Sequence, residues 1–90
     1  MKEILLLTVG HAVQVSEDVL IAPFLLADNF DFDLDWINKI KIVKPDNQLL
    51  DKYAEFGIPL DAPSRMYILL ILNTQTDEIP IGSQIWIVNN

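Results

Sequence analysis

Apolar residues in this chain gather in short runs, and the longest unbroken run is Met66–Leu72. Arg65 precedes it, and polar residues follow over Asn73–Asp77. A run of this length between polar residues is typical of a β-strand buried on both faces, because helical segments usually need about ten residues or more. We therefore predict a central buried strand over Met66–Leu72, with the other apolar segments folded around it.

The remaining apolar segments also have the length and alternation of strands. Predicted strands cover Glu3–Val9, Val19–Ala22, Ile37–Lys44, Leu49–Ile58 and Ser83–Val88. We expect the second of these to stop at Pro23, because proline cannot donate a hydrogen bond within a central ladder. Along the first, alternation places Leu5, Leu7 and Val9 on one face.

Turn residues separate these strands at short intervals. Pro45, Asp46 and Asn47 suit a tight turn that joins two strands into a hairpin. In the strand before this turn, Ile40 and Ile42 should point inward, and Lys39 and Lys41 should point outward. In the strand after the turn, one side is shared by Leu49, Asp51, Tyr53 and Glu55. Short strands at this spacing predict an all-β fold, namely a single small closed or partly open β-barrel of about six mostly antiparallel strands over residues 1–90.

Asp28–Trp36 alternates between apolar and acidic residues, which favours a half-buried extended segment. Its apolar side has Phe30, Phe32, Leu34 and Trp36, and its acidic side has Asp31, Asp33 and Asp35. The aspartates resemble the start of a calcium loop, but Trp36 and Ile42 stand where that loop requires Gly and Glu. We expect them to keep an outer edge hydrated and to discourage strand pairing, with no metal site.

Composition narrows the class of protein. The chain has 90 residues, 51% of them hydrophobic, which is enough for one domain with apolar surface left for a partner. It has no cysteine, so it lacks disulfides and thiolate zinc sites. The N-terminal segment has no clear small-residue cleavage site and reads as a strand, so we expect a cytoplasmic protein.

The net charge of −7 argues against polyanionic partners. Nucleic acids and anionic membranes bind clustered Lys and Arg, whereas the six basic residues here are scattered. Lys39, Lys41 and Lys44 form a local group, which we interpret as the solvated side of a strand. Direct nucleic-acid binding and membrane binding are therefore not expected.

The sequence shows no constellation of catalytic or cofactor-binding residues. His11 is the only histidine and has no partner ligands for zinc. Gly10, Gly57 and Gly82 are too far apart for a phosphate loop. Ser16, Ser64 and Ser83 stand in turn-like settings, where hydroxyls bond nearby backbone. We therefore expect no enzyme activity, no cofactor and no metal.

Two segments carry a family resemblance. Ile40–Asn47 reads as a hairpin, and Ile79–Ile87 places a glycine-containing turn before a short closing strand. Together they resemble the β-barrel that forms the second domain of elongation factor Tu, in a form similar to small stand-alone bacterial proteins with such a barrel. Gly10 matches the first glycine of the Gly-Arg-Gly that follows the first strand in that family, and His11 and Ala12 do not match the rest. The resemblance implies a docking module without catalysis.

The leading functional interpretation is a non-catalytic protein-interaction module. Its candidate residues are Trp36 and Trp86, with Asp31, Asp33 and Asp35. Core packing is the favoured alternative for both tryptophans, although Trp is frequent at interface hot spots. The partner is an unknown protein or a second copy, paired through the apolar N-terminal strand. The alternative function is an acidic regulatory or inhibitory partner of a basic or nucleic-acid-binding protein.

Overall fold

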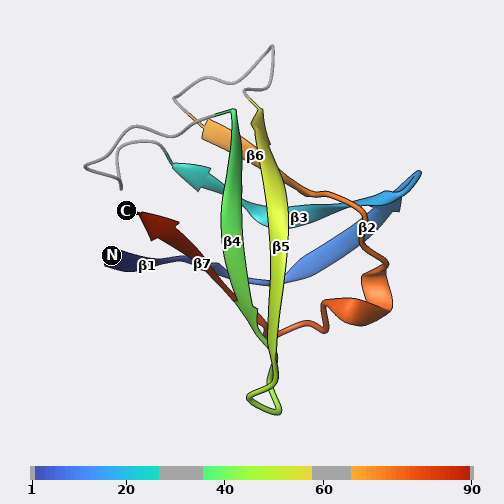
Figure 1. Cartoon of the computed structure of the whole chain (residues 1–90). Coiled ribbons are helices and arrows are strands. Elements are labelled where there is room, and N and C mark those ends of the chain that lie inside the picture. Colours follow the sequence, from blue (N-terminus) through green and yellow to red (C-terminus); the bar gives the residue numbers. More distant parts are fainter. Residues whose placement is uncertain (1, 27–35, 58–65, 90) are drawn as a thin grey trace.

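The computed structural model describes residues 2–26, 36–57 and 66–89, which are arranged as one antiparallel sheet of seven strands (Figure 1). The strands are β1 (Lys2–Thr8), β2 (His11–Val15), β3 (Asp18–Leu26), β4 (Ile37–Val43), β5 (Leu49–Gly57), β6 (Met66–Ile71) and β7 (Gln84–Asn89). A short 3-10 helix, η2 (Thr76–Glu78), lies between β6 and β7. The predicted all-β class is therefore confirmed.

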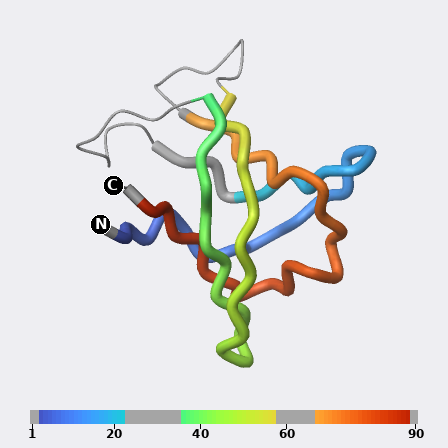
Figure 2. Tube along the Cα trace, in the orientation of Figure 1, coloured from blue at the N-terminus to red at the C-terminus, as the bar shows by residue number. Residues whose placement is uncertain are grey.

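The strands lie side by side in the order β1-β7-β4-β5-β6-β3-β2. β1 and β2 follow each other in the chain, yet they stand at the two ends of this order, so the ladder does not close. Between them, the Val9 amide donates to the Ser83 carbonyl at 2.8 Å and the Gly10 amide to the Ala22 carbonyl at 2.9 Å. The chain passes from β1 to β2 with a bend and no reversal (Figure 2). The predicted closure into a barrel stays a prediction.

The core lies on one face of the sheet, and alternation along each strand decides which residues reach it. In β4, Ile40 and Ile42 are fully buried, whereas Lys39 is exposed and Lys41 half-buried, as the pattern predicts. The buried apolar residues that form the core are Leu7, Val9, Val19, Ile21, Ile40, Ile42, Ala54, Phe56, Leu69, Ile71, Ile79, Ile85 and Ile87.

The long apolar run forms β6, between β5 and β3. Leu69 and Ile71 are buried in the core, whereas Ile68 and Leu70 are half-buried on the opposite face. The predicted position of the strand is confirmed. The prediction of full burial on both faces is wrong, because the described residues leave the side chains of Ile68 and Leu70 partly open to solvent.

β1 changes face part-way along its length. Leu5 pairs with Trp86, and the register then shifts so that Leu7 pairs with Ile85. A one-residue shift turns every later side chain to the other face of the sheet. Leu7 and Val9 therefore enter the core, while Leu5 stays outside and is 42% exposed. The prediction that all three share one face is wrong for Leu5.

β3 continues past its proline. The pairing of β3 with β6 is irregular between Ile21 and Leu25, and Pro23 lies within this stretch. An irregular stretch tolerates proline because no ladder hydrogen bond from its nitrogen is needed there. The predicted strand end at Pro23 is therefore wrong, and Val19–Ala22 is only a part of β3.

A tight turn joins β4 to β5, as predicted. The Asn47 amide donates to the Lys44 carbonyl at 2.8 Å, and the Lys44 amide donates to the Gln48 carbonyl at 2.9 Å. Asn47 has a φ of 69°, a left-handed conformation that asparagine tolerates better than most residues. Pro45 and Asp46 complete a three-residue hairpin loop of a common type.

Candidate protein-interaction face

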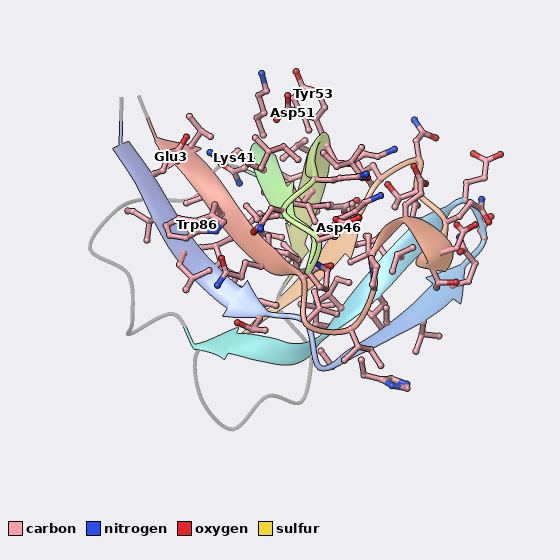
Figure 3. The ribbon with its side chains drawn as sticks, turned by 90° about the horizontal axis from the view of Figure 1, so that it is seen from below. Glu3, Lys41, Asp46, Asp51, Tyr53 and Trp86 are labelled. Atoms are coloured by element: carbon pink, nitrogen blue, oxygen red, sulfur yellow. The ribbon has the colours of Figure 1, made fainter. Side chains whose placement is uncertain are left out.

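The strand register brings four residues into one row on the outer face of the sheet, which points away from the core. Leu5 in β1 pairs with Trp86 in β7, Trp86 pairs with Lys41 in β4, and Lys41 pairs with Asp51 in β5. Residues directly opposite in antiparallel strands have Cβ atoms about 4.5–5.5 Å apart. The row is therefore a continuous surface across four adjacent strands, and Figure 3 labels its last three members.

Two large apolar residues extend this row along β5. Alternation places Leu49 and Tyr53 on the same side of the strand as Asp51, and they are 64% and 57% exposed. We name the whole set the Trp86 face; it consists of Leu5, Lys41, Leu49, Asp51, Tyr53 and Trp86. Neighbouring exposed apolar side chains of this size mark interaction sites more strongly than isolated ones do.

An ion pair crosses the Trp86 face. Lys41 Nζ lies 2.9 Å from both carboxylate oxygens of Glu3, and β7 lies between the two strands that carry this pair (Figure 3). Both side chains are partly exposed, so the pair contributes only about 0–1 kcal/mol to stability. Trp86 Nε1 donates to Gln84 Oε1 at 3.3 Å. These contacts restrict the rotamers of Lys41 and Trp86 before any partner arrives.

The two tryptophans do not pack in the core, contrary to the favoured alternative. Trp36 is 68% exposed, and its carbonyl accepts a hydrogen bond from the Phe56 amide at 3.0 Å. Trp86 is half-buried and alternates with Ile85 and Ile87, whose side chains are buried. Trp86 belongs to the row on the outer face, whereas the register places Trp36 outside that row.

The predicted interaction residues Asp31, Asp33 and Asp35 lie outside the described residues, so their role stays a prediction. Within residues 2–26, 36–57 and 66–89, no group of three or more His, Asp or Glu side chains is arranged to hold a metal ion. His11 is exposed at the start of β2.

Sequence reasoning did not select Leu5, Leu49 or Tyr53 as interaction residues. For Leu49 and Tyr53 a signal was present, because alternation along their strand already placed both on the side of Asp51. For Leu5 the sequence contains no signal, since the order of apolar and polar residues along the strand does not reveal the register shift after Leu5.

Two buried hydroxyls stabilise the backbone. Ser83 Oγ donates to the Pro80 carbonyl at 2.6 Å, and Thr74 Oγ1 donates to the Leu72 carbonyl at 2.7 Å. Both hydroxyls thus have their proton engaged by a carbonyl oxygen, which makes neither an activated nucleophile. The predicted turn role of Ser83 is confirmed.

Glu78 organises the loop that precedes β7. Its carboxylate accepts a hydrogen bond from the Gln75 amide at 2.7 Å, and Lys52 Nζ lies 3.4 Å from its other oxygen. The hydrogen bond from Gln75, with a smaller contribution from the Lys52 charge, lowers the pKa of Glu78 below its ordinary value. Its carboxylate is therefore ionised at neutral pH and acts as a fixed acceptor.

No helix in the described part of the chain is long and apolar enough to cross a membrane. No family model, curated protein or solved structure matches the chain. The resemblance to the second domain of elongation factor Tu therefore stays a prediction.

Proposed function

We propose that this chain is a non-catalytic protein-interaction module that docks a partner on the Trp86 face. The observation that carries the proposal is the Trp86 face, where the exposed side chains of Leu5, Leu49 and Tyr53 and the half-buried Trp86 lie on one side of the sheet. Interface centres are enriched in Trp and Tyr. Lys41 and Asp51 lie between Trp86 and Tyr53 on this face, where they would offer polar contacts to a partner.

The proposed scaffold is a small, partly open β-barrel in the cytoplasm, similar to the second domain of elongation factor Tu. Support comes from the link between the two end strands, in which Val9 and Gly10 bond to Ser83 on one side and Ala22 on the other. A strand that bends at Gly10 and joins both ends of the sheet is a device by which small barrels avoid open edges.

Peptide selection tests the proposed docking face. Peptides selected from a random library on the immobilised chain should bind Tyr53→Ala and Leu49→Ala variants at least about tenfold more weakly than the unmodified chain, because truncation of an interface hot spot costs about 2 kcal/mol or more. Val13→Ala is the matched control. Val13 is also exposed and apolar, but it lies on β2, which β6 and β3 separate from β5. Equal binding to Tyr53→Ala and the unmodified chain would overturn the proposal.

A second copy of the chain is one proposed partner. β1 stands at one end of the strand order, and an end strand can pair with its own copy across a two-fold axis. We expect sedimentation velocity to show a concentration-dependent dimer in the micromolar range, weakened by Leu5→Glu. A monomer at all these concentrations would exclude the homodimer and leave the peptide test unaffected.

The alternative proposal is an acidic regulatory or inhibitory partner of a basic or nucleic-acid-binding protein. The net charge of −7 favours it. Salt separates the two proposals, because binding through an acidic surface should weaken steeply between about 50 and 500 mM salt, whereas apolar docking should change little. The same selected peptides, measured across this range, provide the comparison.

A further inference from the structure

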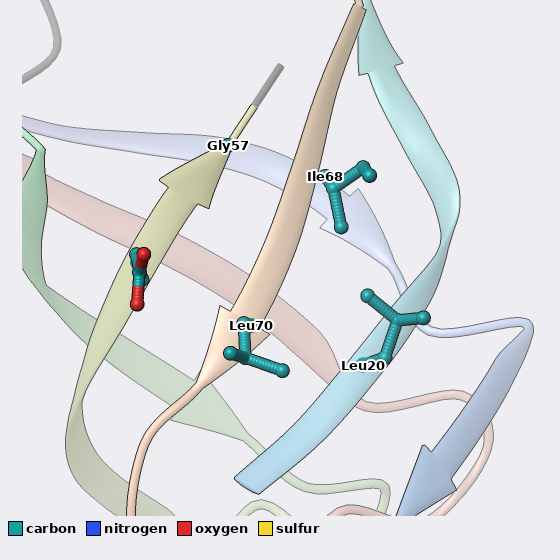
Figure 4. A pocket seen from close by; sticks show the side chains of 5 residues that line it. Leu20, Gly57, Ile68 and Leu70 are labelled. Atoms are coloured by element: carbon teal, nitrogen blue, oxygen red, sulfur yellow. The ribbon is translucent and has the colours of Figure 1, made fainter. Parts of the chain in front are cut away.

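A hollow of about 160 Å³ lies on the outer face of β5, β6 and β3, beside the Trp86 face. Its lining residues are Leu20, Glu55, Gly57, Ile68 and Leu70. The register assembles them, because Glu55 pairs with Leu70, Leu70 pairs with Leu20, and Gly57 pairs with Ile68. Figure 4 shows the aliphatic side chains on neighbouring strands with the end of β5 beside them.

Gly57 keeps this hollow open. A Cβ atom built on Gly57 would meet no other atom within 4 Å, so the space above this end of β5 is vacant. The φ of Gly57 lies outside the left-handed region, so its backbone does not require glycine. Glycine within a strand often marks a place where another group approaches closely. A side chain at position 57 would therefore extend into the hollow.

The size and charge of the hollow define its occupant. Sites for small organic ligands usually measure about 300–1,000 Å³, so a hollow of 160 Å³ suits one side chain. Three walls are aliphatic, and the charged group in the lining is the Glu55 carboxylate. Among the described residues, the ion pairs are Lys41 with Glu3 and Lys52 with Glu78, which leaves Glu55 without a cation.

We propose that the hollow binds one arginine side chain of the protein docked on the Trp86 face. Long basic side chains lay their aliphatic stem along apolar surface and keep the charged head at its edge. Leu20, Ile68 and Leu70 would contact the stem, and the Glu55 carboxylate would accept hydrogen bonds from the guanidinium. This inference rests on the proposed function, because it places an arginine of the docked protein beside the Trp86 face.

A small probe tests the hollow separately from the Trp86 face. The probe is N-acetyl-arginine methylamide, titrated into methyl-labelled protein while the methyl signals of Leu20, Ile68 and Leu70 are followed by NMR. We expect saturable shifts in these signals with a millimolar Kd. N-acetyl-citrulline methylamide keeps the shape and removes the charge, and its Kd should be about two- to fivefold weaker, as for a partly exposed ion pair.

Three variants test which residues are responsible for binding of the arginine probe. Glu55→Gln should raise the Kd of the arginine probe to that of the citrulline probe, and Gly57→Leu should abolish the shifts for both by filling the hollow. Glu17→Gln is the control, because it removes an exposed carboxylate outside both the lining and the Trp86 face, and it should leave the Kd of both probes unchanged.

The melting temperature of each variant shows whether it is folded, and Glu55→Gln serves as the test if Gly57→Leu does not fold. Equal Kd values for the two probes, or a Kd for the arginine probe that is unchanged in Glu55→Gln, would overturn the arginine site. Peptide binding through Tyr53 would survive that outcome, so failure of the hollow is distinguishable from failure of the docking face.

Discussion

Three residues other than glycine adopt a positive φ among those the structure describes: Ser16 at 58°, Asn47 at 69° and Asn73 at 49°. Ser16 and Asn47 stand in hairpin turns between paired strands, and Asn73 stands in the bend between β6 and η2. Small polar side chains reduce the cost of this conformation, because they bond locally to the backbone. The turn residues therefore carry local strain so that the long apolar strands can keep their register.

Ser16→Gly should stabilise the protein. Ser16 is the first of two residues between the paired Val15 and Asp18, a position at which hairpin loops with positive φ favour glycine. Its carbonyl accepts a hydrogen bond from Gln14 Nε2, and glycine keeps that carbonyl. We expect the free energy of unfolding in urea to rise by about 0.5–1 kcal/mol. Glu17→Gly, at a residue without positive φ, is the control and should not stabilise; a loss of stability in Ser16→Gly would contradict this account.

Glu78 should make stability depend on pH in the acid range. Because the fold lowers the pKa of Glu78, its ionised form stabilises the protein above the ordinary value of 4.5, and this contribution is lost as pH falls through the lowered pKa. Glu78→Gln should be less stable than the unmodified chain at pH 7 and equally stable near pH 3, measured by urea unfolding. Asp77→Asn is the control; a stability difference that stays constant with pH would refute the assignment.

At the scale of elements, irregularities in two strands decide which faces are apolar. The shift in β1 turns Leu7 into the core and leaves Leu5 outside, and the irregular stretch in β3 accommodates Pro23. Bulges of this kind bend a strand and increase its twist, which helps a short sheet to curve around its core. The same shift places Leu5 beside Trp86, so one irregularity contributes to both core and candidate site.

Leu7→Ala should therefore lower the free energy of unfolding more than Leu5→Ala does, although alternation alone places both residues on the same side of the strand. Leu7 is nearly buried, and its truncation should lower the free energy of unfolding by about 2–4 kcal/mol. Leu5 is 42% exposed, so its truncation should cost about 1 kcal/mol or less. Urea unfolding of the two variants measures both values, and an equal loss would mean that the shift in β1 is misplaced.

At the scale of the molecule, one core holds segments from both ends of the chain. β4 pairs with β5 and with β7, so Ile42 lies opposite Leu50 on one side and opposite Ile85 from the end of the chain on the other. It is fully buried among other aliphatic residues, and the described structure has only apolar members in this cluster. The stability of the sheet therefore depends on a few positions in its central strands.

Ile42→Asp should unfold the protein. A carboxylate placed in an apolar core without a partner costs several kcal/mol, which is comparable to the whole stability of a small domain. Circular dichroism should show loss of the cooperative melting transition. Lys39→Asp is the matched control, because it introduces the same group on the exposed side of β4 and should retain the fold. An unchanged melting temperature in Ile42→Asp would mean that the register of β4 is wrong.

The sequence by itself determined the all-β class, the hairpin turn at Pro45–Asn47, and the alternation of β4, because these depend on local backbone preference and on period. Only the tertiary structure decided the faces of Leu5 and Trp86. Leu5 follows the alternation of the strand until a register shift that no residue type predicts. Trp86 is a large aromatic residue, a type that is expected in a core. The Trp86 face and the hollow at Gly57 exist because strands distant in sequence pair in one register, and long-range pairing is not encoded in the period of any single strand.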